Sequence, residues 1–153
     1  MKIIVDADAQ PAKEAILSAA KKHSIRTVFV MSNAHYSEKN EEADEVILVD
    51  NRKQEADIKI MNIAAKGDIA VTGDTGLGLF LAAKGLAVIS PRGRLLSEDD
   101  LVVKNGIAAI EKKSLRAKKG KIKLRGPSKY TAEDRTRLEA AIEKVILNGG
   151  APK

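Results

Sequence analysis

The sequence predicts an α/β protein, a three-layer α/β/α sandwich in which helices cover both faces of a mainly parallel sheet. Two observations lead to this prediction. Short apolar runs alternate with segments of helical periodicity along most of the chain, and no internal repeat interrupts them. That alternation is typical of right-handed crossovers between parallel strands. The length of 153 residues suits one such domain with a sizeable core.

The strands are predicted from apolar runs of four to six residues that are bounded by polar or turn-forming residues. The second run ends at Ser32-Asn33, Gly67-Asp68 precedes the fourth, and Pro91 stops the last. These signals place the five strands at residues 2–6, 26–31, 46–49, 69–72 and 86–89.

The helices are predicted from their end signals and their apolar stripes. Pro11 opens the first helix, and Gly85 closes the third. Thr131 is an N-cap for the last helix, with Asp134 three residues on. One face of that helix is apolar, as expected of a helix that packs on the core. The five predicted helices cover residues 11–22, 54–65, 75–84, 98–112 and 131–147. The last two are C-terminal helices that follow the final strand.

Charge divides the chain into parts. Residues 1–100 carry 13 Lys/Arg and 16 Asp/Glu, a net charge of −3, whereas residues 101–153 carry 14 and 5, a net charge of +9. We therefore predict an α/β core at 1–111, a basic connecting segment at 112–130, and a final helix packing on the core with a short tail at 131–153. An acidic region beside a basic one suits a polyanionic partner.

The composition excludes several kinds of chemistry. The chain has no cysteine, so it has no disulfide, no thiolate nucleophile and no zinc–thiolate site. His23 and His35 are isolated from each other in the sequence, and we expect both at the surface. Neither a signal peptide nor an apolar segment of membrane-spanning length is recognisable. A cytoplasmic location without a membrane partner is the expectation.

Aspartates follow three of the apolar runs, at Asp6, Asp50 and Asp74, and Asp8 lies two residues after the first. Parallel strands open their carboxyl ends on one edge of a sheet, where ligands bind. Carboxylates gathered there either repel one another or share a hard cation such as Mg²⁺ or Mn²⁺. We select Asp6, Asp8 and Asp74, and leave out Asp50 because its strand is expected at the sheet margin.

Each selected aspartate also has a structural alternative. Asp8 could cap the first helix, and Asp74 lies at a strand-to-helix junction, where an N-cap is common. Asp57 would lie in the first turn of a helix whose N-terminus should face the same edge, but acidic residues are favoured in first turns by the helix dipole alone. Asp44 looks like part of an ordinary polar loop.

Several blocks of the chain carry a family resemblance. Val5-Asp6-Ala7-Asp8-Ala9-Gln10-Pro11 is similar to the opening motif of the bacterial YaiI/YqxD family of uncharacterised proteins. Further matching blocks follow in order: Gln54-Glu55-Ala56-Asp57, Lys66-Gly67-Asp68-Ile69-Ala70-Val71-Thr72-Gly73-Asp74, Gly76-Leu77, Lys84-Gly85, Ser90-Pro91-Arg92-Gly93, Gly126-Pro127 and Asp134-Arg135. Gln10 stands where the family usually has cysteine, so a thiol is not essential to the function of this chain.

This family resembles a branch of the PIN-like fold, and the resemblance implies a ribonuclease that depends on Mg²⁺ or Mn²⁺. It further implies Asp6, Asp57 and Asp74 as catalytic metal ligands, with Asp8 as an additional one. Three or four carboxylates holding one or two ions would activate water and stabilise the leaving group in phosphodiester hydrolysis. We expect these carboxylates to converge within reach of one ion.

The predicted partner is nucleic acid, RNA rather than DNA. Residues 112–129 hold nine Lys/Arg and no acid, enough for electrostatic, salt-dependent binding. The chain has two Phe, two Tyr and no Trp, too few for a clear base-stacking surface, so binding should not depend on base sequence. Arg92 could reach a phosphate at the sheet edge, or could serve a turn with Pro91 and Gly93. The predicted contacts are Arg92, Lys118, Lys119, Lys121, Lys123 and Arg125.

Two other functions stay open. One is a non-catalytic module with the same fold that binds RNA or a protein partner. The other is a haloacid-dehalogenase-like phosphatase, which also opens with two aspartates after an apolar strand. That superfamily normally has a hydroxyl residue where this chain has Gln10, and a further aspartate after Gly73-Asp74, which this chain lacks. A homo-oligomer is compatible with either function.

Overall fold

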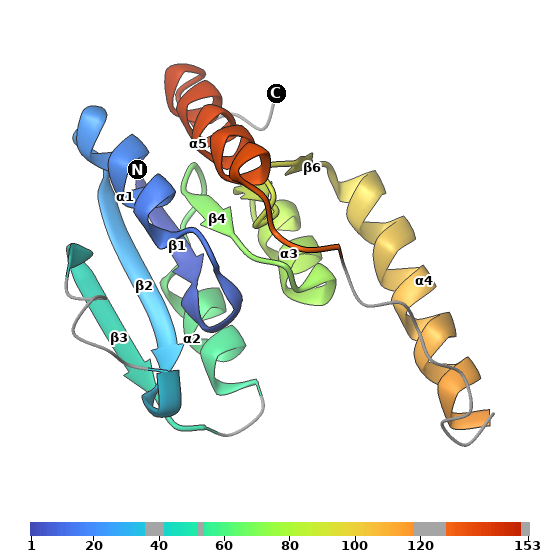
Figure 1. The fold of residues 1–153 in the computed structure, drawn as a ribbon. Coiled ribbons are helices and arrows are strands. Elements are labelled where there is room, and N and C mark those ends of the chain that lie inside the picture. Colours follow the sequence, from blue (N-terminus) through green and yellow to red (C-terminus); the bar gives the residue numbers. More distant parts are fainter. Residues whose placement is uncertain (36–41, 52–53, 118–127, 151–153) are drawn as a thin grey trace.

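The computed structural model describes residues 1–35, 42–51, 54–117 and 128–150 (Figure 1). Its centre is a six-stranded sheet in the order β3-β2-β1-β4-β5-β6. The first five strands in that order are parallel, and β6 runs antiparallel to β5. The strands are β1 (Lys2–Asp6), β2 (Arg26–Ser32), β3 (Glu45–Val49), β4 (Ile69–Val71), β5 (Ala87–Ile89) and β6 (Leu95–Leu96).

Helices cover both faces of this sheet, which confirms the predicted three-layer sandwich. Alternate residues of β1 point to opposite faces: Ile3 and Val5 join the core beneath α1 and α5, whereas Ile4 joins the core beneath α2 and α3. The helices are α1 (Lys13–Lys22), α2 (Glu55–Ile63), α3 (Thr75–Ala83), α4 (Glu98–Ala117) and α5 (Ala132–Leu147), with short 3₁₀ turns η1 (Ala7–Ala9) and η2 (Asn33–His35).

The order of the strands creates a crevice at one edge of the sheet. From β1 the chain proceeds outward to β2 and β3, and it then returns to β4, on the other side of β1, before it continues to β5. Connections therefore leave β1 and β4 in opposite directions, and the crevice at such a switch point is the usual ligand site of an open parallel sheet. Asp6 ends β1, and Asp74 follows β4 by three residues.

Several element ends differ from the predictions by one or two residues, and three differences have an identifiable cause or a consequence. Helix α1 begins at Lys13, not at Pro11, because the side chain of Gln10 accepts a hydrogen bond from the backbone nitrogen of Ala12 and shapes a turn before the helix. Helix α4 continues to Ala117, so the predicted boundary between 111 and 112 falls inside a helix. Strand β6 was not predicted, because two residues are too short for a recognisable period.

Asp44 has a structural role, whereas the sequence suggests only a residue of an ordinary polar loop. Its Oδ2 accepts hydrogen bonds from the backbone nitrogen of Thr27 at 2.8 Å and from the Thr27 hydroxyl at 3.1 Å. These bonds lower the pKa of Asp44. They also join the start of β3 to the start of β2, so Asp44 is a structural residue.

No helix in the described part of the chain is both long and apolar enough to cross a membrane.

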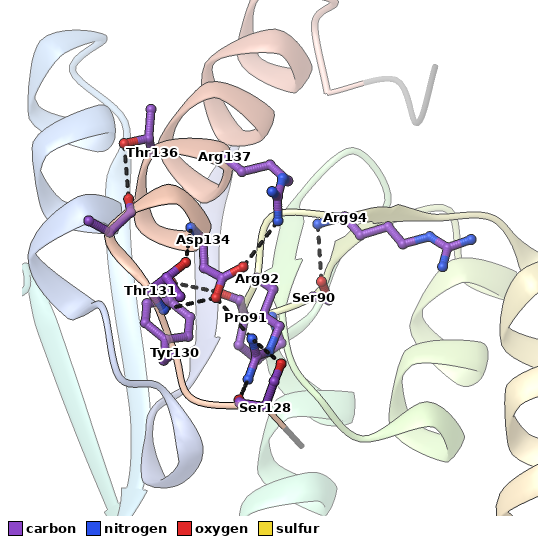
Figure 2. A network of polar contacts seen from close by, with 11 residues as sticks. Ser90, Pro91, Arg92, Arg94, Ser128, Tyr130, Thr131, Asp134, Thr136 and Arg137 are labelled. Carbon is purple, nitrogen blue, oxygen red and sulfur yellow. Dashed lines mark hydrogen bonds and ion pairs between the residues drawn. The ribbon is translucent and has the colours of Figure 1, made fainter.

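Helix α5 begins with the capping box of Thr131 and Asp134, which confirms the predicted N-cap. Asp134 is buried and also accepts hydrogen bonds from Arg92 at 2.9 Å and from Arg137 at 3.0 Å (Figure 2). The pKa of Asp134 is lowered, chiefly by the hydrogen bond from the Thr131 backbone and also by the two arginines. This network fastens the last helix to the loop after β5.

Candidate functional site

Asp6 is the central residue of the candidate site. It ends β1 between the neighbouring strands, and its Oδ2 accepts a hydrogen bond from the Thr72 hydroxyl at 3.2 Å. Its pKa is raised to about 6. Burial is the largest cause, and the negative charges of Asp57, Asp8 and Asp74 add to it, while the bond from Thr72 acts in the opposite direction. The negative charge of Asp6, added to those of its neighbours, is thus unfavourable unless a proton or a cation compensates it.

Asp8 connects the end of β1 to the end of β2. It lies in η1, and its Oδ1 accepts hydrogen bonds from the Ser32 backbone nitrogen at 2.9 Å and from the Ser32 hydroxyl at 3.3 Å. Asp8 therefore does not cap α1, whose N-cap is Ala12. Ser32 lies at the predicted edge, and the neighbouring Asn33 is exposed in η2.

Asp57 and Asp74 lie at the N-terminal ends of two helices that face the same edge. Asp57 lies in the first turn of α2, and its pKa is raised, first by burial and then by the charge of Asp74. Asp74 is the N-cap of α3, where its Oδ1 accepts a hydrogen bond from Leu77 at 3.0 Å. The structural alternative for Asp74 is therefore real, and it does not remove the carboxylate from the neighbourhood of Asp57.

Thr72 joins the two acidic sides of the site, although the sequence did not single it out. Its hydroxyl donates to Asp6 and accepts from the backbone nitrogen of Asp74 at 3.1 Å. The residue is buried directly after β4. One hydroxyl thus orients the Asp6 carboxylate and the turn that carries Asp74. Its place two residues before Asp74 in a matching block was the available signal.

Two adjoining hollows surround these acids. The first has a volume of about 390 Å³ and includes Asp6, Asp8 and Asp57 in its lining. The second, of about 440 Å³, includes Asp57, Asp74 and Lys112. Gln54 and Asp57 line both hollows. The sheet edge is therefore one continuous acidic region, here called the acidic crevice, with a lysine of α4 at one side.

Sequence reasoning left out some residues that line the acidic crevice. Asp50, rejected as a residue of the sheet margin, lines the first hollow and is exposed. Gln54 precedes α2 with a φ of 76°, a left-handed conformation that is uncommon for a residue other than glycine. Asn105 and Lys112 on α4 line the second hollow. No local pattern identifies them, because the packing of α4 against α3 brings them there.

The carboxylates have the right chemistry for a hard cation, but they do not form a closed ligand set. Oxygen ligands of this kind suit Mg²⁺ and Mn²⁺. Among the described residues, however, no three Asp, Glu or His side chains lie close enough together to hold a metal ion. The expected convergence of Asp6, Asp57 and Asp74 on one ion is therefore not formed in this structure. The side chains lie around the same crevice at a wider spacing.

Arg92 lies at the carboxyl edge but is occupied by structural contacts. Its guanidinium donates to Asp134 and to the backbone oxygen of Ser128, and it lies 5.7 Å from the centre of the Tyr130 ring (Figure 2). These contacts favour the structural alternative, and its contact with nucleic acid stays a prediction. The other predicted contacts, Lys118, Lys119, Lys121, Lys123 and Arg125, lie outside the described residues.

His23, the histidine whose side chain the structure describes, lines neither hollow of the acidic crevice. His23 is partly buried, not at the surface as expected, and its Nε2 lies 3.6 Å from Glu143 of α5. The side chain of His35 lies outside the described residues.

A larger hollow of about 1190 Å³ lies elsewhere, lined by α1 and by the starts of β2 and β3. It contains none of the predicted site residues, and its acids and bases are mixed, so we do not regard it as the candidate site.

The double role of Asp74 gives a test. Asp74→Asn should keep the cap of α3, because an asparagine oxygen accepts the same hydrogen bond from Leu77. Asp74→Ala should lose the cap and about 1 kcal/mol of stability. Urea unfolding of both variants measures the difference. If both variants lost the same stability, the negative charge, and not the hydrogen bond, would be what Asp74 supplies to the fold.

Comparison with known proteins places this chain among bacterial relatives. Residues 4–148 match the family model described as "Uncharacterized BCR, YaiI/YqxD family". A "UPF0178 protein" of Listeria welshimeri is 39% identical over 147 residues, which are 96% of each chain. One of Bacillus velezensis is 36% identical over 147 residues, covering 95% of this chain and 85% of the relative. The resemblance stated from the sequence is confirmed, and the chain belongs to the YaiI/YqxD family.

Proposed function

We propose that this chain is a divalent-metal-dependent nuclease that hydrolyses phosphodiester bonds, with RNA as the substrate. The observation that carries the proposal is the electrostatic state of Asp6. Burial and three neighbouring carboxylates raise its pKa to about 6. Perturbed pKa values of this kind cluster at functional sites, because catalysis and metal binding need charged groups that are brought together despite their repulsion. The PIN-like resemblance of the family points to the same chemistry.

In this proposal Asp6, Asp57 and Asp74 hold Mg²⁺ or Mn²⁺, and Asp8 contributes from the first hollow, which it lines together with Asp6 and Asp57. The bound ion would supply charge stabilisation and an activated water. Because Mg²⁺ keeps several of its waters, carboxylates at a wider spacing can act through them. The chain itself contributes orientation: the Thr72 hydroxyl fixes the Asp6 carboxylate, and Ser32 fixes Asp8.

Lys112 and Asn105 of α4 suggest how an RNA strand would lie across the acidic crevice. Both line the hollow that also contains Asp57 and Asp74. A lysine beside an acidic crevice can bind a phosphate that the carboxylates alone would repel. We include the basic residues Lys118 to Arg125 in the proposal as contacts that follow Lys112 along the chain. Binding through them would weaken as salt is added. A cytoplasmic location, in keeping with a sequence without cysteine, is part of the same proposal.

A non-catalytic RNA-binding module is the second candidate. It is favoured by one observation, the lack of a closed ligand set among the described residues. In such a module the basic residues would bind RNA, and the acidic crevice would have no catalytic part. The two candidates therefore differ in their response to metal: only the nuclease needs a divalent ion.

The test is cleavage of an end-labelled single-stranded RNA by the purified chain with Mn²⁺, with Mg²⁺ and with a chelator. We expect cleavage with either ion and none with the chelator. Asp57→Asn should reduce the rate by at least about a hundredfold. Glu55→Gln is the matched control, because it removes a charge from the same first turn of α2.

The outcomes separate the candidates and exclude a contaminant. Equal cleavage by wild type and Asp57→Asn would assign the activity to another site on the chain or to another protein in the preparation. RNA binding without cleavage under any ionic condition would overturn the nuclease proposal and leave the binding module. Loss of activity in both variants would show that α2 responds to charge in general, and not that Asp57 has a special role.

A further inference from the structure

Helix α4 has one packed side and one open apolar side. Leu101 is buried, and Ala108 is partly buried on the same side, where α4 packs on α3. Figure 1 shows α4 standing away from the body of the sheet, with α3 as its neighbour. Four large apolar side chains of α4 are each more than half exposed: Val102, Val103, Ile107 and Ile110. They cluster on the side opposite Leu101, because their positions lie on one face of a helix.

Gly106 lies at the centre of this apolar face. A Cβ placed on it would meet nothing within 4 Å among the described residues. Glycine inside a helix costs about 1 kcal/mol relative to alanine, so its presence in an exposed helix has no benefit for this chain alone. A missing side chain between large aliphatic neighbours does allow a second backbone to come close.

One acid–base pair and one apolar pair of α4 lie at equal distances on either side of Gly106. Acidic residues occupy the first turn, and lysines follow the apolar face. Asp99 lies seven residues before Gly106 and Lys113 seven residues after it. Val102 and Ile110 lie four residues before and after it. An antiparallel copy of α4 with its two-fold axis at Gly106 would therefore pair Asp99 with Lys113 and Val102 with Ile110.

We propose that the open face of α4 binds α4 of a second copy of this chain, antiparallel, in a two-fold symmetric dimer. The occupant is a second copy because this face is complementary to itself in both charge and apolar surface, as a two-fold interface requires. The antiparallel arrangement also places helix ends of opposite dipole charge together. The packed side of α4, which lines the acidic crevice, stays free of this contact.

One pair of helices buries less than a standard interface, so the dimer should be weak, with a dissociation constant on the order of micromolar. Sedimentation velocity of the full chain from about 2 to about 200 μM would cover that range. We expect a shift from monomer to dimer for wild type. Ile110→Glu should stay monomeric throughout, because it places a charge in the apolar contact. Leu147→Glu, a change at an exposed leucine of α5, should dimerise as wild type does.

A wild-type chain that stays monomeric over the whole range would overturn the proposal, and the face would then serve another partner or residues of its own chain. A dimer that forms equally in Ile110→Glu would overturn it as well, because the contact would lie elsewhere. Circular dichroism of each variant reports whether the helices are kept.

Charge reversal tests the register without changing the apolar face. Asp99→Lys alone, or Lys113→Asp alone, should weaken the dimer by roughly tenfold, because each sets like charges against one another twice in the symmetric pair. The double variant should recover the wild-type affinity, although it keeps both unfavourable interactions with the helix dipole. If the double variant were as weak as the single ones or weaker, Asp99 would not face Lys113 and the proposed pairing would be wrong.

Discussion

Gly93→Ala is expected to lower the free energy of unfolding by about 3 kcal/mol or more. Gly93 has a φ of 85° in the turn between β5 and β6, and a Cβ there would overlap the backbone of Arg137 and Leu138 in α5. Two costs add: the left-handed backbone conformation of a residue with a side chain, and the displacement of a helix. Helix α5 would have to move away from the core that Leu138 and Ile142 help to form.

Gly67→Ala is the matched control for Gly93→Ala. Gly67 has a φ of 90°, but a Cβ there meets nothing within 4 Å. It should cost about 1 kcal/mol from backbone conformation alone. Urea unfolding of both variants measures the difference. Circular dichroism is the signal, because the chain has no tryptophan. Equal costs would contradict the close approach of α5 to the turn at Gly93.

Asp6→Asn is expected to have two opposite effects, on activity and on stability. Activity towards RNA with Mn²⁺ should fall by at least about a hundredfold, because a charged ligand is lost. Stability without metal should rise at pH 8 by about 2 kcal/mol. The asparagine oxygen can still accept the hydrogen bond from Thr72, so the change removes the charge and keeps the contact.

The pH dependence follows from the direction of the shift. The pKa of Asp6 is about 6 in the folded chain, above its ordinary value of 3.8. Protonated Asp6 therefore stabilises the fold fully below pH 3.8, and this contribution is lost as the pH rises through 6. Asp6→Asn should thus match wild type near pH 3.8 and exceed it at pH 8.

Thermal unfolding across this pH range measures the effect, with Asp50→Asn as the control. Asp50 lines the same hollow but is exposed, so its variant should follow wild type. If the difference in stability between Asp6→Asn and wild type were the same at every pH, the charge of Asp6 would not affect stability. That result would contradict the crowding of carboxylates in the acidic crevice.

The sequence was informative wherever a local signal determines structure. Apolar runs and periodic segments predicted the sheet and its two helical layers, because burial of one face is what each element requires. The pair Thr131 and Asp134 predicted its own cap, since a capping box is a local interaction. Asp6 was recognisable because a charge at the end of a buried strand has no local explanation. Asp74 had a local explanation as an N-cap, and it was selected because it was expected at the same sheet edge as Asp6.

The rest depends on contacts between distant parts of the chain. Thr72 matters because β4 lies beside β1 and brings its hydroxyl to Asp6. The sequence left Arg92 open between a phosphate contact and a turn residue, and only the docking of α5 reveals Asp134 as its partner. The wider spacing of the carboxylates is likewise a matter of packing. No sequence pattern distinguishes acids that share an edge from acids that already form a closed ligand set.

The central claim, that the acidic crevice binds a divalent ion, is tested most directly by calorimetric titration of the metal-free chain with Mn²⁺ at pH 8. The account predicts a binding site in wild type and in Glu55→Gln that is lost or severely weakened in Asp6→Asn and in Asp57→Asn. A wild-type chain that binds no Mn²⁺, or an Asp6→Asn variant that binds it as wild type does, would contradict the account.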